Sequence, residues 1–234
     1  MRKHLGWKGL VLCAVLASAS PALAQKQTVN FTIGGFVPRG EDGRVGGDVI
    51  TENRTFLVFD VDEFNSVTVG AEWLFPIGSF VEGGAGVSFT GRSVPTVYTC
   101  CVDNAGNEIE QELRLRRIPI DLTMRFLPLG QSSPVQVYFG GGLTVIPWRY
   151  SETGDFIDFN HDGVVFHDQF AGSGTATGGV ALGGVRIQGG GIAGGFEVKY
   201  HKAEASFDSD DDEFAGPKID LGGWTYQGTI GFRF

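Results

Sequence analysis

The clearest structural signal in the chain is the alternation in Trp224-Thr225-Tyr226-Gln227-Gly228-Thr229-Ile230-Gly231-Phe232-Arg233-Phe234. Aromatic and aliphatic side chains, with one glycine, occupy the even positions, while polar residues and another glycine occupy the odd ones. A period of two predicts a β-strand whose faces meet different environments. An aromatic last residue suits a ring anchored at a membrane–water boundary and suits a soluble protein poorly. We interpret the segment as the closing strand of a transmembrane β-barrel.

The first 24 residues have the pattern of a signal peptide. Three basic residues flank or precede an apolar run at positions 10–19, which is too short to span a bilayer as a helix, since that needs about 20 residues. Ala22-Leu23-Ala24 has the small-x-small form of a cleavage site. We therefore expect export with cleavage near Ala24/Gln25, and one β-barrel domain over residues 25–234.

Composition narrows the class of protein further. Removal of the signal peptide takes three of the 18 basic residues and changes the formal charge from −9 to −12. Such an acidic chain is a poor match for nucleic acid, which binds a basic face. The 37 glycines and 19 phenylalanines, against two methionines, suit closely curved strands with aromatic rings at an interface.

Eight segments have strand character, and the connections between them alternate in length. They are residues 27–37, 65–75, 80–92, 117–126, 135–150, 175–188, 192–205 and 224–234. Long connections follow the first, third, fifth and seventh; short ones follow the second, fourth and sixth. Outer-membrane barrels have long external loops and short periplasmic turns. The pattern predicts an all-β fold: a closed, antiparallel, up-and-down transmembrane barrel of about eight strands.

Two local features of the sequence do not follow this eight-strand pattern, and each leads to its own prediction. Residues 55–61, inside the first long connection, are β-prone and would extend a strand beyond the membrane. Leu113 and Leu115 have the opposite parity to the apolar face of segment 117–126. We expect a β-bulge near Arg116, which would reverse the parity and also accommodate Pro119.

The charged residues of the strands fall on the face that would line the barrel interior. On the lipid side, an Arg or Lys near the bilayer midplane would cost about 2–4 kcal/mol. An eight-stranded barrel is just wide enough for side chains to fill it, and a buried charge needs a partner. We expect a salt-bridged polar plug, with a narrow gated pore as the alternative. The inward set is Glu72, Glu82, Arg117, Asp121, Arg125, Arg186, Glu197, Lys199, His201 and Arg233.

Aromatic residues are expected in two belts, as membrane interfaces favour. The alternative is packing inside a soluble sandwich. The belt near the short turns would contain Trp73, Phe75, Phe126, Phe232 and Phe234, and the belt near the long loops would contain Tyr150, Tyr200 and Trp224.

Together, the signal peptide, the alternating connections and the Gly231-Phe232-Arg233-Phe234 terminus resemble the small outer-membrane β-barrel family. That family includes OmpA-type domains, OmpW-like proteins and opacity-type porins. The resemblance implies location in the bacterial outer membrane, with outer-membrane lipid and lipopolysaccharide as partners. It also implies that Ile230, Phe232 and Phe234 act as a signal for the outer-membrane assembly machinery. It brings no residue-level functional motif.

The expected outer loops contain one candidate metal site. Asp158, Asn160 and Asp162, followed by Gly163, match the first half of a calcium loop, but the twelfth position is Gln169 and not glutamate. Asp168 or Asp155 would have to substitute; the alternative is a solvated acidic turn. We expect no other cofactor.

Two further features of the outer loops are an acidic run and a cysteine pair. The run at 208–213 would gather divalent ions near lipopolysaccharide or be a solvated loop tip. Cys100 and Cys101 would be thiols or a vicinal disulfide.

Catalysis has little support in the sequence. After the signal peptide the histidines are His161, His167 and His201, and no Ser–His–acid arrangement is marked. The sequence favours a non-enzymatic barrel with a charge-plugged lumen and an envelope-structural or loop-mediated surface role. One alternative is a narrow porin-like channel for small or apolar solutes. The other is a secreted, lipocalin-like binding barrel with the apolar face inside.

Overall fold

The computed structural model describes residues 27–103, 105–158, 163–207 and 214–234, and β-strands account for most of them. The expected signal peptide, 1–24, lies outside these residues. The strands are β1 Thr28–Pro38, β2 Ser66–Pro76, β3 Val81–Val102, β4 Glu108–Arg117, β5 Ile120–Phe126, β6 Val135–Asp158, β7 Val164–Gly189, β8 Ile192–Ser206, β9 Lys218–Asp220 and β10 Gly223–Arg233.

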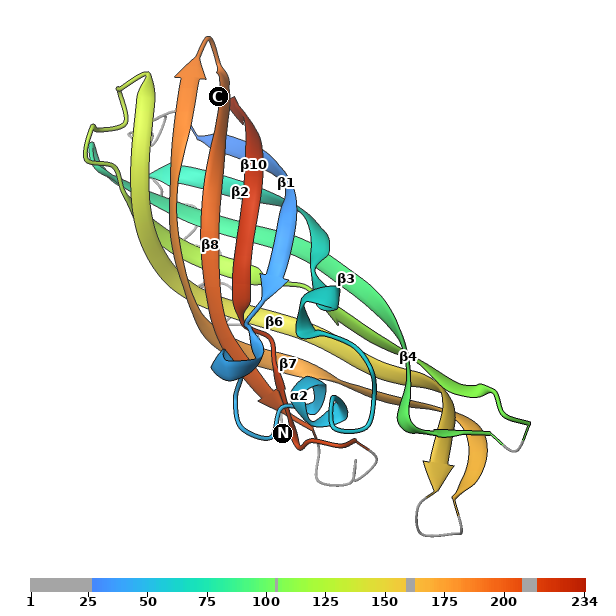
Figure 1. Ribbon diagram of the computed structural model, residues 1–234. Helices are drawn as coiled ribbons and strands as arrows, with labels where there is room; N and C mark the ends of the chain where they lie inside the picture. The colour runs from blue at the N-terminus through green and yellow to red at the C-terminus, as the bar shows by residue number, and fades with distance from the viewer. Residues whose placement is uncertain (1–26, 104, 159–162, 208–213) are drawn as a thin grey trace, which may run out of the picture.

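The strands form a closed antiparallel ring (Figure 1). Each main strand pairs with the next, and β10 closes the ring by pairing with both β1 and β8. β4 and β5 lie end to end between β3 and β6, so together they occupy one of eight positions around the ring. The short β9 pairs with the end of β8, and its Lys218 also forms a bridge to Asp48 in the connection between β1 and β2. The predicted fold class, an all-β up-and-down barrel of eight strands, is confirmed.

Several strands are much longer than the sequence suggested. Expected loops at 93–111 and 151–174 are largely strand: β3 and β4 continue to pair, and the β6–β7 ladder extends to Asp158 and Val164. These extensions still alternate, but their outward residues are mostly polar and their inward residues mostly apolar, with Thr96, Gln111 and Glu152 as buried polar exceptions. The loss of the outward apolar pattern was therefore mistaken for the end of the strands.

The expected bulge near Arg116 is absent from the described strands. The register of β4 and β5 against β6 is continuous from Gln111↔Gly154 to Phe126↔Phe139. Leu113, Leu115 and Arg117 are all buried on the inward face. The two leucines do not need a parity reversal, because the interior itself becomes apolar at their level. The ladder is interrupted only at 118–119, where the Ile118 amide donates to the Pro147 carbonyl.

The barrel interior thus has two sections of opposite character. In the polar section, near the short turns, charged side chains are buried inside the barrel. In the apolar section, near the long connections, the inward residues join one hydrophobic core. Its barrel-wall members are Val94, Leu113, Leu115, Ile146, Trp148, Tyr150, Ala176 and Ala203.

The connection between β1 and β2 folds over this end of the barrel and fills the apolar section. It contains three short helices: η2 Glu41–Gly43, α2 Val49–Asn53 and η3 Val61–Phe64. Val49, Ile50 and Phe64 belong to the same core as the barrel wall. The strand expected at 55–61 is not formed; Leu57 makes only an isolated bridge to Tyr98. We call residues 39–64 the plug segment.

A broad apolar band covers the outside of the polar section. Val67, Ile120 and Ile230 are exposed there, while the intervening residues of their strands are buried. No helix among the described residues is long and apolar enough to cross a membrane.

Most of the expected aromatic belts face outward with this band. Trp73, Phe126, Phe232 and Phe234 are exposed towards the short-turn end, and Tyr200 packs against Trp224 with ring centroids 4.7 Å apart. Tyr150 was wrongly placed in the outer belt. It is fully buried, because the even-numbered residues of β6 face the interior.

Candidate functional site

Arg125 on β5 is the centre of the charge cluster in the polar section. It pairs with Glu72 of β2, with Glu197 of β8 at 2.8 Å and with Glu82 of β3 at 3.9 Å. All four side chains are buried. Because strand alternation places each of them inside, one guanidinium holds carboxylates from three other strands across the lumen.

Lys199 on β8 extends this cluster. Its Nζ lies 3.3 Å from Asp121, 3.5 Å from Glu197 and 3.6 Å from Glu72. Asp121 also accepts a hydrogen bond of 2.7 Å from the Thr144 hydroxyl and lies 3.1 Å from the His201 Nε2. The ammonium group therefore links the Arg125 carboxylates to a second acidic centre nearer the apolar section.

A third cation, Arg186 on β7, completes the cluster. It pairs with Glu82 at 2.9 Å, and its Nε donates to the Gln136 side-chain oxygen at 2.9 Å. The Tyr138 ring lies 5.0 Å from the Arg125 guanidinium carbon and 5.8 Å from that of Arg186. We call the complete set the lumen network; it contains Glu72, Glu82, Asp121, Arg125, Arg186, Glu197, Lys199 and His201.

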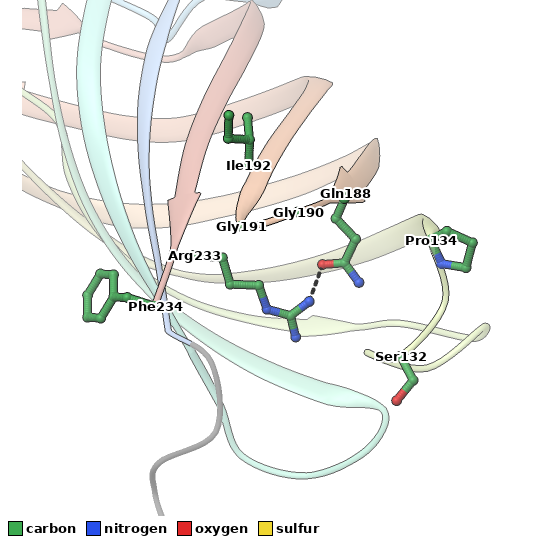
Figure 2. Close-up of a pocket in the computed structure, with 9 residues that line it drawn as sticks. Ser132, Pro134, Gln188, Gly190, Gly191, Ile192, Arg233 and Phe234 are labelled. Atoms are coloured by element: carbon green, nitrogen blue, oxygen red, sulfur yellow. Dashed lines mark hydrogen bonds between the residues drawn. The ribbon is translucent and has the colours of Figure 1, made fainter.

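Two of the expected lumen residues lie apart from this network. Arg117 is buried at the boundary between the sections, where it donates to the Leu221 carbonyl at 2.6 Å and lies 3.7 Å above the Phe36 ring. Arg233 lies at the short-turn rim, where it donates to Gln188 at 2.5 Å (Figure 2). Neither forms an ion pair in the described part of the chain.

The rim around Arg233 encloses an open pocket of about 380 Å³. Figure 2 shows Arg233 and Phe234 on one side of it, with the Gln188 turn and Pro134 on the other. The arrangement places a cation at the short-turn mouth of the barrel, and it contains no nucleophile paired with a base among the residues that line it.

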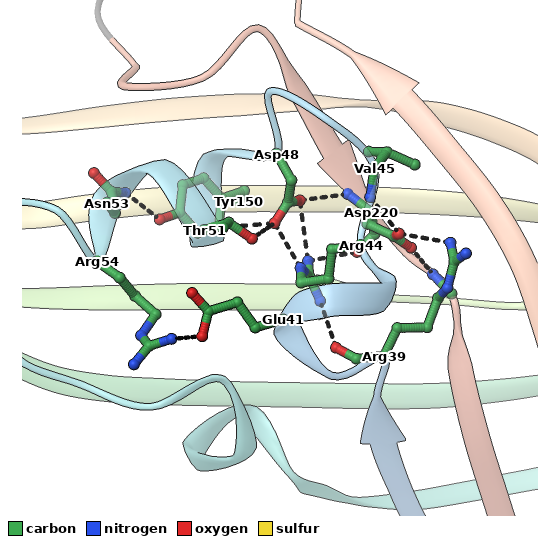
Figure 3. Close-up of polar contacts among 11 residues, drawn as sticks. Arg39, Glu41, Arg44, Val45, Asp48, Thr51, Asn53, Arg54, Tyr150 and Asp220 are labelled. Carbon is green, nitrogen blue, oxygen red and sulfur yellow. Dashed lines mark hydrogen bonds and ion pairs between the residues drawn. The ribbon is translucent and has the colours of Figure 1, made fainter.

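At the opposite end, the Arg39–Asp220 ion pair attaches the plug segment to β9, and a second, buried ion pair, Arg44–Asp48, lies within the segment (Figure 3). Asp48, the N-cap of α2, accepts from Arg44 at 2.5 and 3.0 Å and from the Asp220 amide at 2.7 Å. Asp220, on β9, accepts from Arg39 at 2.7 Å and from the Val45 amide at 3.1 Å. We call these four charged residues the plug clamp.

A buried carboxyl group lies under the plug segment. Glu152 of β6 accepts from the Asn53 amide at 2.5 Å and from the Tyr150 hydroxyl at 2.9 Å. Burial raises the pKa of Glu152, although both hydrogen bonds oppose that shift. The sequence reading missed Glu152 and the plug clamp because it placed them in loops. Asp48, three residues before Thr51, was the available signal for a helix cap.

The proposed calcium loop falls largely outside the described residues. Asp158 is described and ends β6, whereas Asn160 and Asp162 are not, and neither is the acidic run at 208–213. Within the described chain, no three His, Cys, Asp or Glu side chains are grouped to hold a metal ion. The calcium site stays a prediction.

Cys100 and Cys101 form a vicinal disulfide near the end of β3. The sequence left open whether these residues are thiols or a disulfide, and the structure contains the disulfide. The bond lies at the loop end of the barrel, where the β3–β4 register is irregular between Val97 and Val102.

Comparison with known proteins gives a structural match without a sequence match. No protein-family model and no curated protein sequence matches the chain. Among solved structures, the outer membrane protein OprG from Pseudomonas aeruginosa matches with a TM-score of 0.50 at 12% identity, over 89% of this chain and 95% of that one. The fold is that of the small outer-membrane β-barrels.

Two further structures of this outer-membrane barrel class are similar at lower scores. Ail, the attachment invasion locus protein of Yersinia pestis, matches at 9% identity and a TM-score of 0.44, over 89% of this chain and 98% of Ail. The N-terminal β-barrel domain of Pseudomonas aeruginosa OprF matches at 10% identity and a TM-score of 0.41, over 89% and 97%.

Proposed function

We propose that this outer-membrane-type barrel is a non-catalytic, non-conducting protein of the bacterial outer membrane. It would contribute to the envelope structurally or through its outer loops. The membrane location is supported by the apolar band outside the polar section, because exposed side chains such as Ile33, Leu122 and Leu143 are costly in water and suited to lipid. The long connections would face the cell exterior.

The main observation in favour of a closed lumen is that Arg125 forms ion pairs across it. Its ion pairs to Glu72 and Glu197 join β5 to β2 and β8, none of which is adjacent to β5 in the sheet. The plug segment then fills the second section with apolar side chains. An ion entering from either end would meet one of these two obstructions.

The reversed arrangement of a lipocalin-like barrel has no support in the polar section, where Ile120 and Ile230 are exposed and Arg125 and Lys199 are buried. The apolar section does have an apolar interior, but the plug segment occupies it. A secreted protein would be released from cells without detergent; we expect this protein to remain with the outer-membrane fraction and to migrate differently on gels before and after boiling.

Conductance across a planar lipid bilayer tests the closed state directly. We expect the refolded protein to insert without stepwise currents. Stepwise currents that change in size or ion selectivity in Arg125→Ala would contradict the proposal and support the narrow-channel alternative. Insertion should be verified independently, by flotation with liposomes, so that failed insertion is not mistaken for a closed barrel.

Two partner assignments belong to the same proposal. Ile230, Phe232 and Phe234 face outward at the end of β10 and would serve as the signal for the assembly machinery. Outer-membrane lipid would surround the apolar band. Substitution of Phe232 and Phe234 by alanine should lower the amount of assembled barrel in cells without a matching loss of refolding in detergent.

A further inference from the structure

Three arginine side chains lie together on the outward face of the barrel, directly beyond the apolar band. Arg114 and Arg116 are on β4, and Arg149 is on the neighbouring strand β6. All three are exposed, whereas their neighbours Leu115 and Trp148 point inward. We call them the arginine cluster. They fall in stretches where the outward pattern changes from apolar to polar.

The register places two of these cations directly opposite one another. Arg116 is the Cα partner of Arg149. Side chains opposite each other in an antiparallel pair have Cβ atoms about 4.5–5.5 Å apart, and like charges there are destabilising. Arg114 is two residues along the same face, about 7 Å away. Such a cluster is stabilised when an anion lies among the three guanidinium groups.

The described protein itself supplies no such anion. No carboxylate in the described residues pairs with Arg114, Arg116 or Arg149. Their outward neighbours on the flanking strands are neutral: Gly91, Ser93 and Ser173. The nearest outward acidic residue on the same strand is Glu112, two residues beyond Arg114 and farther from the apolar band.

The apolar surface next to the cluster indicates what kind of molecule would carry the anion. Phe89, Ile118 and Val145 are exposed at the end of the band nearest to the arginines. The Arg116 guanidinium carbon lies 5.8 Å from the centre of the Phe89 ring. A ligand bound here would meet cations at one end and apolar side chains along the other, so an amphiphile satisfies both and a free anion satisfies only one.

We propose that the arginine cluster binds the phosphate of a phosphorylated lipid in the outer leaflet, the chemistry that the lipid A part of lipopolysaccharide presents. The inference rests on the proposed membrane orientation, which puts the long connections outside. Guanidinium groups bind phosphate oxygens in a bidentate way, and three of them suit an anion with more than one negative charge. The acyl chains would lie along Phe89, Ile118 and Val145.

Titration of the refolded protein in detergent micelles tests the site. The probes are diphosphoryl lipid A, lipid A stripped of its phosphates, and inorganic phosphate. We expect the diphosphoryl form to bind more tightly than the stripped form, and inorganic phosphate at the same concentration not to displace it. Arg116→Gln and Arg149→Gln should each weaken binding by about 10- to 100-fold, the effect of losing one charge-assisted contact. Lys202→Gln, an exposed basic residue on β8, should leave binding unchanged.

A second readout separates a binding role from a structural one. Without lipid A, Arg149→Gln should be as stable in detergent as the unmodified protein, or more so, because it removes a facing like charge. A destabilised Arg149→Gln would instead mean that the arginine holds the barrel together, and the proposal would be wrong.

Three binding results would also overturn the site. These are equal affinity for the two lipid A forms, displacement of lipid A by equimolar inorganic phosphate, and equal loss of binding in Lys202→Gln. Liposome flotation keeps this test separate from the proposed function. A protein that inserts into liposomes but binds both lipid A forms equally well contradicts only the lipid site. A protein that does not insert contradicts the proposed membrane location.

Discussion

Arg125 of β5 and Glu197 of β8 form an ion pair of 2.8 Å through the middle of the barrel, although β6 and β7 separate their strands in the sheet. The pair joins opposite parts of the wall and does not merely link neighbouring strands. Because both side chains are buried, each would be an uncompensated charge without the other. We therefore expect the lumen network to stabilise the barrel, in addition to the obstruction of the lumen that we propose.

Replacing Arg125 with methionine should destabilise the barrel by about 3–5 kcal/mol, the cost of removing one member of a buried ion pair. Glu72 and Glu197 would then keep Lys199 as their cationic partner, and Glu197 would keep its hydrogen bond from Gln227. Urea unfolding of the refolded protein, followed by tryptophan fluorescence, measures the change. The exposed Lys202→Met serves as the control and should shift stability by less than about 0.5 kcal/mol.

A double variant makes the Arg125 prediction sharper. Adding Glu197→Gln to Arg125→Met removes one of the carboxylate charges left behind, so the two losses should not add. Strictly additive losses would mean that the ion pair has no energetic role.

Asp48→Asn should release the plug segment without unfolding the barrel. The substitution removes a buried charge held by Arg44 and by two backbone amides, at a local cost of about 3 kcal/mol. Hydrogen exchange over residues 48–64 should become faster, while exchange in β8 and β10 stays slow. The matched control is Asp42→Asn, an exposed position in the same segment. Unchanged exchange in Asp48→Asn would mean that apolar packing alone retains the plug.

The strands around the apolar band were predictable because one rule governs them: apolar side chains face outward and charged side chains face inward. Ile118, Ile120 and Leu122 face outward, and Asp121 and Arg125 face inward, as the alternation implied. The same rule also placed most of the lumen network, since parity alone decides which charged residues share the interior. Which cation pairs with which carboxylate depends on strand tilt and side-chain reach, and the sequence carries no direct signal for either.

The apolar section was misread because its rule is the reverse. Leu113 and Leu115 are inward there, and Arg114 and Arg116, which alternate with them, are outward, as in a water-soluble barrel. A strand with constant register therefore resembled one with a parity change. The helix α2 was missed because only five residues form it, and tertiary contacts stabilise it more than its own propensity.

The buried Glu152 predicts that retention of the plug segment weakens as pH rises. Burial raises its pKa in the folded state above the ordinary value near 4.5. Folding therefore favours the protonated form, and this contribution is lost as pH rises through the folded-state pKa. The protection factors of amides over residues 48–57, which are corrected for the intrinsic pH dependence of hydrogen exchange, should be larger at pH 5 than at pH 8. Glu152→Gln, which is neutral at both values, should reduce this dependence; a dependence of the same size would assign it to another group.

Removing the vicinal disulfide should have little effect on stability. A disulfide stabilises mainly by closing a loop in the unfolded chain, and adjacent residues enclose almost none. The double variant Cys100→Ser and Cys101→Ser should shift the free energy of unfolding by less than about 0.5 kcal/mol. A loss above about 2 kcal/mol would show that the pair anchors the outer end of β3.

Leu113→Ala tests whether the apolar section is a true hydrophobic core. The side chain is fully buried among the plug segment and the barrel wall, so its truncation should cost about 2–5 kcal/mol. The loss should appear as faster exchange at the outer ends of β4 and β6 and in the plug segment. The neighbouring Glu112→Ala, on the outward face, is the control and should change stability by less than about 0.5 kcal/mol. If Leu113→Ala were as mild as its control, the plug would be a loosely resting loop, and the second obstruction of the lumen would be lost from the proposed closed state.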